Sequence, residues 1–326
     1  MLCINRHSTD PYINLATEEY VLKNFDEDCF MLWINEPCII VGKHQNAIAE
    51  INIDYVTENN IPVIRRLSGG GTVFHDLGNL NFTFIKKEVK TSIDFKKFTQ
   101  PILDILNNLG VDAVHGGKND LLINGKKISG NSEHIWKNKV MHHGTLLFSS
   151  SINELSAALK IKEGIYTDKA VKSNRSEVTN ISEHLKKPLS INQFTQLIIN
   201  HLSSYYNDTR FYDLTDEDYI KINELVATKY NTWEWNFGYS PVYKLNKSIL
   251  NAEGNAIAVS LSVKDGIITH FEINAECIDK TIIQKLESAL INKPHSIETI
   301  KITLKEVFTN DINDEIIISD LLKCII

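Results

Sequence analysis

The sequence predicts an α+β protein in two parts. Short β-rich runs and amphipathic helical patterns are mixed along its 326 residues, and an aromatic stretch with Gly and Pro occupies 232–242. A chain of this length has room for one large core and a second, smaller one. We therefore expect a large domain at 1–244 and a small C-terminal domain at 245–326.

The first part is expected to open with a short strand and a helix inside its first 25 residues, with Asn14 as the helix cap. A helical pattern starts at Asp94 and contains Pro101, which should kink the helix or mark its true start. At 79–85, large apolar residues alternate with Asn and Thr, which indicates a half-buried strand. Further strands are expected at 29–34, 37–42, 62–67 and 140–148.

Turn and capping signals place the remaining elements. Asn124-Gly125 predicts a tight hairpin between 121–123 and 126–129, because both turn residues tolerate positive φ. Helices are expected at 152–160, at 191–206 behind Ser190, and at 217–230 behind the near-capping box Thr215-x-x-Asp218. The second part should contain strands around the Asp265-Gly266 turn, a helix near 280–292, a strand near 299–304 and a helix near 313–322.

Composition narrows the class of protein. There are 34 basic residues against 41 acidic ones, a net charge of −7, so the broad basic surface of a nucleic-acid-binding protein is not expected. No apolar run is long enough to cross a bilayer, and the N-terminus lacks a signal-peptide layout. Five cysteines without CxxC spacing argue against a disulfide framework or a thiolate zinc site. We expect a cytoplasmic protein, without nucleic-acid or membrane partners.

The segment 65–76, RRLSGGGTVFHD, lies between two predicted strands. Three glycines in a row allow a ligand to approach the backbone closely, and their N–H groups can bind an anionic oxygen. Arg66 adds a charged donor. The segment contains no GxxxxGK[ST] pattern, so P-loop chemistry is disfavoured.

The hairpin around Asn124-Gly125 carries two adjacent lysines. Because side chains alternate along a strand, Lys126 and Lys127 should project to opposite faces, so that one can enter an internal site. Asp120 stands just before the hairpin, and a carboxylate beside a phosphate site commonly binds Mg²⁺.

Two further segments are polar. His142 and His143 are adjacent on a predicted strand, so they should face opposite sides and cannot share a metal ion. The segment 172–180 reads only as a polar loop before a helix.

These segments, in this order, closely resemble the lipoate–protein ligases. The matching motifs are RRLSGGGTVFHDLGN at 65–79, NDL at 119–121, KISG at 127–130, HHGTLL at 142–147, VKSNRSEVTN at 171–180 and WEWNFG at 233–238. The resemblance runs from about 14 to 242 and implies the catalytic core shared with biotin ligases, a mixed β-sheet flanked by helices, followed by a small α+β accessory domain. Biotin ligases carry GRGRxGR in place of RRLSGGG and are the less fitting relatives.

The resemblance also implies a site. Lys127 would be the catalytic residue, touching the acyl carbonyl and the phosphate, and Asp120 would meet the nucleotide and its Mg²⁺. Arg175 to Asn180 would cover the adenosine. The residues expected to bind lipoate or the adenylate are Arg66, Ser68, Gly69, Gly70, Gly71, Val73, His75, Asn119, Asp120, Ser129, Gly130, His143, Gly144, Thr145, Arg175, Val178, Thr179 and Asn180. His134 stands where some relatives have an arginine, so a role of that arginine at the lipoyl end is in doubt.

The implied reaction uses ATP and lipoate to form lipoyl-AMP, with release of pyrophosphate. The lipoyl group then passes to a lysine of a lipoyl domain, in 2-oxoacid dehydrogenase E2 subunits or the glycine cleavage H protein. We expect a monomer. Two alternatives stay open: an octanoyl or lipoyl transferase that works through a thioester of Cys38, and a non-catalytic lipoyl-binding module.

Overall fold

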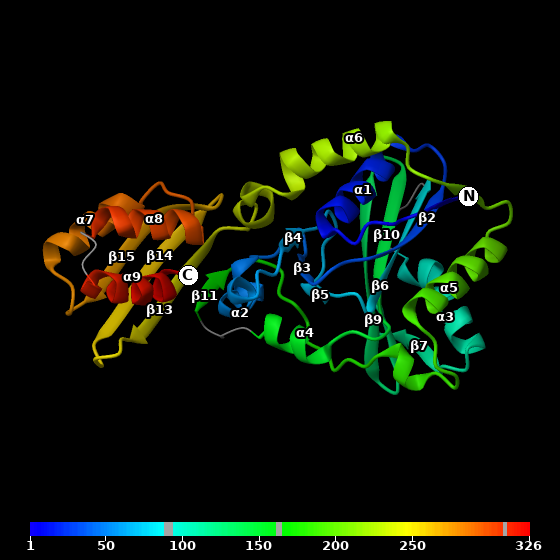
Figure 1. Cartoon of the computed structure of the whole chain (residues 1–326), viewed down its shortest axis with the longest axis horizontal. Coiled ribbons are helices and arrows are strands. Elements are labelled where there is room, and N and C mark those ends of the chain that lie inside the picture. Colours follow the sequence, from blue (N-terminus) through cyan, green and yellow to red (C-terminus); the bar gives the residue numbers. More distant parts are fainter. Residues whose placement is uncertain (88–93, 161–164, 309–311) are drawn as a thin grey trace. The chain divides into compact units, whose positions relative to one another are not determined.

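The computed structural model describes residues 1–87, 94–160, 165–308 and 312–326 (Figure 1). They form two compact units. The first contains Met1–Lys43, Tyr55–Leu159 and Lys172–Thr232, and the second contains His44–Asp54, Lys160–Val171 and Trp233–Ile326. The main part of the second unit thus begins inside the aromatic stretch. Because two earlier segments also belong to this unit, no single cut of the chain separates the two units. The division at 244 and 245 stays a prediction.

An eight-stranded sheet is the centre of the first unit, in the order β12-β1-β2-β6-β10-β9-β8-β7. The pairs β12-β1 and β1-β2 are parallel and the remaining pairs are antiparallel, so the sheet is mixed, as the resemblance implied. Its strands are β1 (Leu2–Ile4), β2 (Cys29–Ile34), β6 (Asn79–Lys87), β7 (Ala113–Gly116), β8 (Asp120–Ile123), β9 (Lys126–Trp136), β10 (Lys139–Leu147) and β12 (Arg210–Tyr212).

Helices cover both faces of this sheet (Figure 1). Helices α3 (Phe95–Asn108) and α5 (Ile191–Tyr205) pack on the face that carries Phe82 and Phe84. On the opposite face, α1 (Pro11–Asn24) brings Glu18 to within 2.6 Å of Thr83 on β6. Strand β6 was expected to be half buried, but every residue from Asn79 to Ile85 is buried because both faces are covered.

A small sheet in the order β4-β3-β5 lies on the same side as α1, where its His75 contacts Trp33 of β2. Strand β3 (Cys38–Val41) pairs in parallel with β4 (Val63–Arg65) and antiparallel with β5 (Val73–His75). The glycine segment therefore connects two strands of this sheet. The other elements of the unit are α4 (Ile152–Ala158), η2 (Ile181–His184), α6 (Asp216–Leu225) and the π-helical turn η3 (Val226–Tyr230), while α2 (Ile53–Glu58) spans both units.

Local signals located most helix starts, with one error. Ser190 caps α5 and Thr215 caps α6, each in a capping box. Helix α3 begins behind Asp94 and continues through Pro101. The cap of α1 is Asp10, not Asn14, because Asp10 accepts the N–H groups of Tyr12 and Ile13 ahead of a proline at the first helical position. Asn14 instead binds backbone carbonyls from inside the helix.

The second unit has a four-stranded antiparallel sheet in the order β11-β13-β14-β15. The predicted Asp265-Gly266 turn connects β14 and β15, and both residues have positive φ, 52° and 75°. The elements are η1 (Ile48–Glu50), β11 (Tyr166–Asp168), η4 (Glu234–Gly238), β13 (Tyr243–Leu250), β14 (Ala256–Lys264), β15 (Ile267–Ala275), α7 (Lys280–Leu290), α8 (Ile297–Val307) and α9 (Ile312–Ile325).

The strand predicted near 299–304 is wrong, because this segment lies in helix α8. Ser296 caps the helix by accepting the N–H of Thr299. Its buried residues are Ile300, Thr303 and Leu304, which repeat at the helical spacing of three and four. Burial of this stripe in the core of the unit outweighs the β-preference of its branched residues. In the described part of the chain, no helix has the length and apolar character that a membrane crossing requires.

Candidate active site

The glycine segment is built around the side chain of Arg66. Its Nη2 donates to the carbonyls of Gly69 (2.6 Å) and Gly71 (2.7 Å), and its Nη1 donates to Ile40 O (3.1 Å). Burial lowers the pKa of Arg66 to about 10, so the side chain stays charged at neutral pH. Most of the guanidinium donors therefore bond to backbone carbonyls and hold the loop in its shape.

This shape leaves the loop amides free. The N–H groups of Gly69, Gly70 and Gly71 make no hydrogen bond to any other residue that the structure describes. Gly70 has a φ of +89°, and a Cβ there would lie 3.0 Å from Arg66 Nη2. A side chain is thus disfavoured both by the backbone conformation and by this tight contact, and consecutive free amides beside a buried cation can bind an anion.

The lysine hairpin has the predicted turn and one added feature. Asn124 and Gly125 have positive φ, 50° and 78°. Leu121 pairs with Ser129 but Leu122 pairs with Lys127, so Ile128 is an extra residue that forms a β-bulge. Through this bulge, Lys127 comes to the same face as Gly130, and its Nζ lies 3.1 Å from the place where a Cβ of Gly130 would be.

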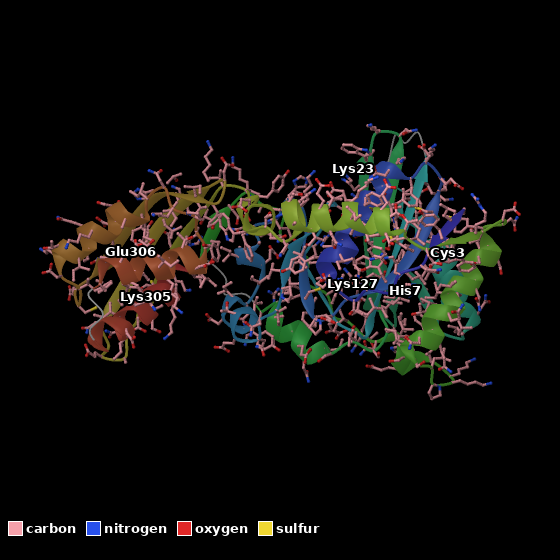
Figure 2. The ribbon with its side chains drawn as sticks, turned by 45° about the horizontal axis from the view of Figure 1, so that its top comes forward. Cys3, His7, Lys23, Lys127, Lys305 and Glu306 are labelled. Carbon is pink, nitrogen blue, oxygen red and sulfur yellow. The ribbon has the colours of Figure 1, made fainter. Side chains whose placement is uncertain are left out.

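The two lysines have separate environments, as predicted. Lys127 Nζ lies 2.8 Å from Asp120 Oδ1, with a quarter of each side chain exposed. Lys126 is more exposed and reaches only Glu177, at 3.9 Å. Lys127 is labelled in Figure 2, within the first unit. Beside it, Thr145 Oγ1 accepts the N–H of Gly130 at 3.2 Å, so Thr145 faces the same side.

The polar loop 172–180 contacts both parts of the site. The N–H of Lys127 donates to Glu177 O (2.8 Å), and the N–H of Thr179 donates to Lys127 O (3.1 Å). Val178 is the residue that bridges to Lys127 in this short parallel pairing. At the other end, Ser173 Oγ accepts the N–H of Thr72 at 2.9 Å. The loop therefore fixes the backbone of the lysine and the end of the glycine segment at once.

The adjacent histidines do face opposite sides of the sheet. His142 stacks on Phe98, with ring centroids 4.8 Å apart, in the core under α3. His143 faces α1 and the glycine segment, where it bonds Glu18 (2.9 Å) and Ser68 (2.5 Å). Among the residues that the structure describes, no group of three or more His, Cys, Asp or Glu is placed to hold a metal ion.

Several predicted site residues have structural partners instead. Ser129 accepts from Asn131, and a side chain at Gly144 would collide with Asn131 and Phe82, so both positions face the core. The side chain of Asn119 donates to Asn131 O. Asn180 bonds Ser150, and Thr179 bonds Glu183 and His184. Arg175 donates to Leu159 O, and His75 bonds Asn35. Val73 pairs with Ile40 in the small sheet. Their part in ligand binding stays a prediction.

Sequence reasoning missed three residues of the site. Glu18 reaches His143 from α1, and Ser132 Oγ donates to Gly69 O at 2.9 Å from β9. Trp33 Nε1 donates to Thr83 Oγ1 at 2.9 Å. Strand alternation could have placed Ser132 on the face of Gly130, but no local pattern points to Glu18.

His134 lies farther along the same face of β9, half buried. Burial lowers its pKa to about 4, and the nearby charge of Lys43 acts in the same direction. At neutral pH this side chain is therefore uncharged.

Cys38 is fully buried in β3. Burial raises the pKa of its thiol, and the nearby polar atom is the amide nitrogen of Asn35, 3.5 Å away. A buried protonated thiol is a poor nucleophile, so the environment disfavours the thioester alternative.

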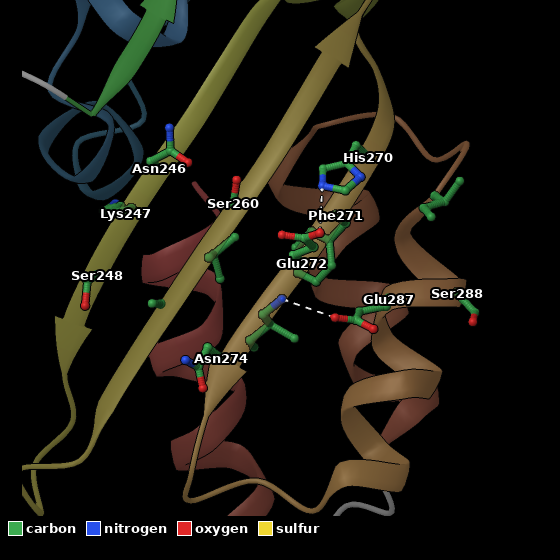
Figure 3. Close-up of a pocket in the computed structure, with 14 residues that line it drawn as sticks. Asn246, Lys247, Ser248, Ser260, His270, Phe271, Glu272, Asn274, Glu287 and Ser288 are labelled. Carbon is green, nitrogen blue, oxygen red and sulfur yellow. Dashed lines mark hydrogen bonds and ion pairs between the residues drawn. The ribbon is translucent and has the colours of Figure 1, made fainter.

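A separate hollow of about 860 Å³ lies in the second unit, on β13 to β15 beside α7 (Figure 3). Its visible polar residues include His270, Glu272 and Asn274 of β15, and Glu287 of α7 bonds the N–H of Ile273. It has neither a glycine segment nor a lysine held like Lys127. The glycine segment and the lysine hairpin lie in the first unit, and the lining of this hollow contains neither.

Comparisons with known proteins define the class. Residues 10–203 match the family model of the lipoyl protein ligase A/B catalytic domain, and residues 240–325 match that of the bacterial lipoate protein ligase C-terminus. The chain therefore belongs to the lipoate–protein ligase family, and it is an enzyme.

Individual relatives match most of the chain. The lipoate-protein ligase LplJ of Bacillus subtilis is 40% identical, over 94% of this chain and 95% of its own. A lipoate-protein ligase A structure with bound ATP superposes with a TM-score of 0.64 at 27% identity, over 73% of this chain and 98% of its own. The bipartite ligase of Thermoplasma acidophilum, described with its E2 lipoyl domain, gives a TM-score of 0.64 at 27% identity, over 73% and 96%.

Proposed function

We propose that this ligase uses ATP to convert lipoate to lipoyl-AMP, with release of pyrophosphate, and then transfers the lipoyl group to a lysine of a lipoyl domain. The observation that carries the proposal is the placement of the Lys127 ammonium over Gly130, with its backbone fixed by 177–179. The related structure with bound ATP supports the choice of nucleotide.

The glycine segment and Lys127 would have different roles in the reaction. The free amides of Gly69 to Gly71 would bind an anionic oxygen, and Lys127 would stabilise charge first on the phosphoryl oxygens and then on the acyl carbonyl oxygen. The carboxylate of lipoate attacks the α-phosphorus, so no nucleophilic side chain is needed in this half-reaction. Holding both reactants in place and keeping water from the mixed anhydride would supply much of the remaining rate.

Asp120 is the residue that fits the nucleotide's magnesium ion. Its Oδ1 is buried and is in ion contact with Lys127, but has no well-directed hydrogen bond. A single carboxylate is enough, because Mg²⁺ keeps most of its waters and binds phosphate oxygens. The ion would neutralise phosphate charge.

The proposed acceptors are lipoyl domains of E2 subunits or of the H protein. The Thermoplasma acidophilum relative, described with its E2 lipoyl domain, supports the first of these. The five cysteines, all in the described part of the chain, are free, which fits a reducing cytoplasm.

The test measures pyrophosphate release in the presence of ATP, Mg²⁺ and lipoate, followed by mass analysis of an added apo lipoyl domain. The proposal requires release that depends on both substrates and a lipoyl adduct on one lysine of the acceptor. Transfer of a preformed acyl group without ATP, and no pyrophosphate release, would support the transferase alternative. In Asp120→Asn, we expect half-maximal activity to need more Mg²⁺ than in the native enzyme.

A further inference from the structure

A chain of buried hydrogen bonds crosses the site from β2 to the glycine segment. Trp33 Nε1 bonds Thr83 Oγ1 (2.9 Å), and Thr83 Oγ1 bonds Glu18 Oε1 (2.6 Å). His143 Nδ1 lies 2.9 Å from Glu18 Oε1, and His143 Nε2 lies 2.5 Å from Ser68 Oγ. The five side chains come from four different strands and helices and from the glycine segment, yet each lies within hydrogen-bond distance of the next.

The direction of these bonds fixes the proton positions. An indole N–H can only donate, so the Thr83 oxygen accepts from Trp33 and its hydroxyl proton goes to Glu18. An ionised carboxylate can only accept, so His143 Nδ1 carries a proton and donates it to Glu18. In the neutral imidazole, Nε2 is then the acceptor, and the hydroxyl of Ser68 donates to it. Arg66 Nε donates to the Ser68 oxygen from the other side, at 3.1 Å.

This order of hydroxyl, imidazole and carboxylate is the one by which enzymes remove a proton from a reacting group. Ser68 directly precedes the three glycines of the glycine segment. His143 pairs across the sheet with Ser132 of β9. Ser132 is two residues from Gly130, next to which the Lys127 ammonium lies. Ser68 and His143 are almost fully buried, so bulk water does not compete for the proton.

We propose that Ser68, His143 and Glu18 form a proton relay that deprotonates the acceptor lysine during lipoyl transfer. This inference rests on the proposed function. The acceptor lysine enters as the neutral amine, after its ammonium has lost one proton to solvent, and it gives a second proton to Ser68 Oγ while the hydroxyl proton of Ser68 passes to His143 Nε2. The amine nitrogen forms a bond to the acyl carbon, the bond from that carbon to the AMP oxygen breaks, and AMP leaves with the electron pair.

The charges around the relay suit this direction of proton flow. Glu18 from α1 faces His143 and stabilises the imidazolium that forms, while Arg66 lies on the far side of Ser68. Two further ionisable groups that interact with His143 are His75 on β5 and His134 on β9. Burial lowers their pKa values to about 3 and about 4, so both are neutral and do not oppose the new positive charge.

The chain offers a matched control for the carboxylate. Glu19 is next to Glu18 on α1 and equally buried, at 2% exposure, but it pairs with Lys23, Lys229 and Tyr230 and takes no part in the relay. Glu18→Gln and Glu19→Gln therefore remove the same charge from the same helix, and only the first changes the partner of His143.

The experiment is single-turnover transfer from preformed lipoyl-AMP to an apo lipoyl domain, measured against pH for the native enzyme, Glu18→Gln, Glu19→Gln and Ser68→Ala. We expect transfer to fall about 100-fold in Glu18→Gln, a usual size for lost general-base catalysis. Adenylation is followed as pyrophosphate release. Its fold loss in Glu18→Gln should be at least ten times smaller than the fold loss of transfer. All four rates should rise with pH towards the lysine pKa of about 10.4, because only the neutral amine attacks, so the losses in Glu18→Gln and Ser68→Ala should appear as a lower rate at each pH.

Equal losses of transfer in Glu18→Gln and Glu19→Gln would overturn the relay, because the effect would then come from buried charge alone. Equal losses of adenylation and transfer in Glu18→Gln would also overturn it, since Glu18 would then only position the acyl group. A native transfer rate in folded Ser68→Ala would do the same. Absence of pyrophosphate release from the native enzyme refutes the proposed function instead, and preformed lipoyl-AMP keeps the two questions apart.

Discussion

The ammonium of Lys127 and the carboxylate of Asp120 lie 2.8 Å apart, and about a quarter of each side chain is exposed. A partly exposed pair of this kind contributes about 1 kcal/mol or less to stability. The carboxylate is therefore a replaceable partner, and a phosphate or carboxylate ligand can take its place beside Lys127. The pair holds the lysine ready without making the fold depend on it.

The first prediction compares the two neighbouring lysines. Lys127→Ala should lower adenylate formation by at least about 100-fold, the usual effect of removing one group that stabilises a developing charge. Lys126→Ala should stay within about twofold of the native rate, because its ammonium reaches only an exposed Glu177 and exposed pairs count for little. Pyrophosphate release measures both. Similar losses in the two variants would mean that the hairpin does not direct Lys127 alone into the site.

The second prediction separates backbone strain from ligand contact at Gly70. Gly70→Ala should cost about 1–2 kcal/mol of stability, because its φ of +89° is unfavourable for a residue with a Cβ. It should also weaken lipoate and ATP binding, because the added carbon meets Arg66 Nη2 at 3.0 Å and disturbs the loop. Titration calorimetry and urea unfolding measure the two effects.

Gly254→Ala is the control for strain. Gly254 has a nearly equal φ of +86° in the second unit, and a Cβ there would meet nothing within 4 Å. This variant should lose similar stability and bind both ligands normally. Unchanged binding in Gly70→Ala would remove the glycine segment from the ligand site.

The sequence could predict features whose cause is local. Asn124-Gly125 predicted the turn, and strand alternation predicted the separation of Lys126 from Lys127 and of His142 from His143. These predictions succeeded because turn conformation and side-chain alternation depend on a few neighbouring residues.

Features that depend on distant segments could not be predicted. Glu18 and His143 are 125 residues apart in the chain, and nothing near Glu18 shows which histidine it meets. The helix at 297–307 is stabilised by burial of Ile300 and Leu304 against other parts of the unit, which overrides a local preference for strand. The bulge at Ile128 likewise becomes visible only in the pairing with β8, and neither Lys127 nor Ile128 is a Gly or Pro.

The third prediction concerns Cys38. Cys38→Ala should retain both half-reactions within about twofold, because a buried thiol with a raised pKa forms no thioester at neutral pH. Transfer from preformed lipoyl-AMP is the direct measurement, with the melting temperature as a check on folding. A folded variant that forms lipoyl-AMP but no longer transfers it would restore the thioester mechanism.

The fourth prediction is a pH dependence of stability through His295 in the second unit. Tyr243 donates to its Nδ1 at 2.5 Å, and its Nε2 donates to Ile325 O at 2.8 Å, so the folded state needs the neutral ring. Burial lowers the pKa of His295 to about 4, below the unfolded value of about 6.5. Between these values the unfolded chain binds more protons, so stability is complete above pH 6.5 and falls as the pH drops towards 4.

The expected loss for this one group is on the order of 2 kcal/mol between pH 7 and pH 5. The free energy of unfolding, measured with urea at several pH values, should depend less steeply on pH in His295→Gln than in the native protein. His270→Gln, on the solvent side of β15, is the control and should keep the native slope. Identical slopes in all three proteins would show that His295 does not contribute.

The last prediction concerns the encounter with the acceptor. Lipoyl domains, the acceptors that the family resemblance implies, are generally small and acidic, and this chain has a net charge of −7. Overall attraction therefore cannot steer the two proteins together, and repulsion between like charges should slow their association at low salt. Recognition has to come from short-range contacts near Lys127, where the acceptor lysine must arrive.

We expect a second-order transfer rate that is constant or rises slightly as salt is added, because added ions screen the repulsion. Stopped-flow transfer from preformed lipoyl-AMP at several salt concentrations measures it. A steep fall with salt would reveal a basic docking surface whose local charge outweighs the net charge of the chain, and recognition by short-range contacts alone would then be wrong.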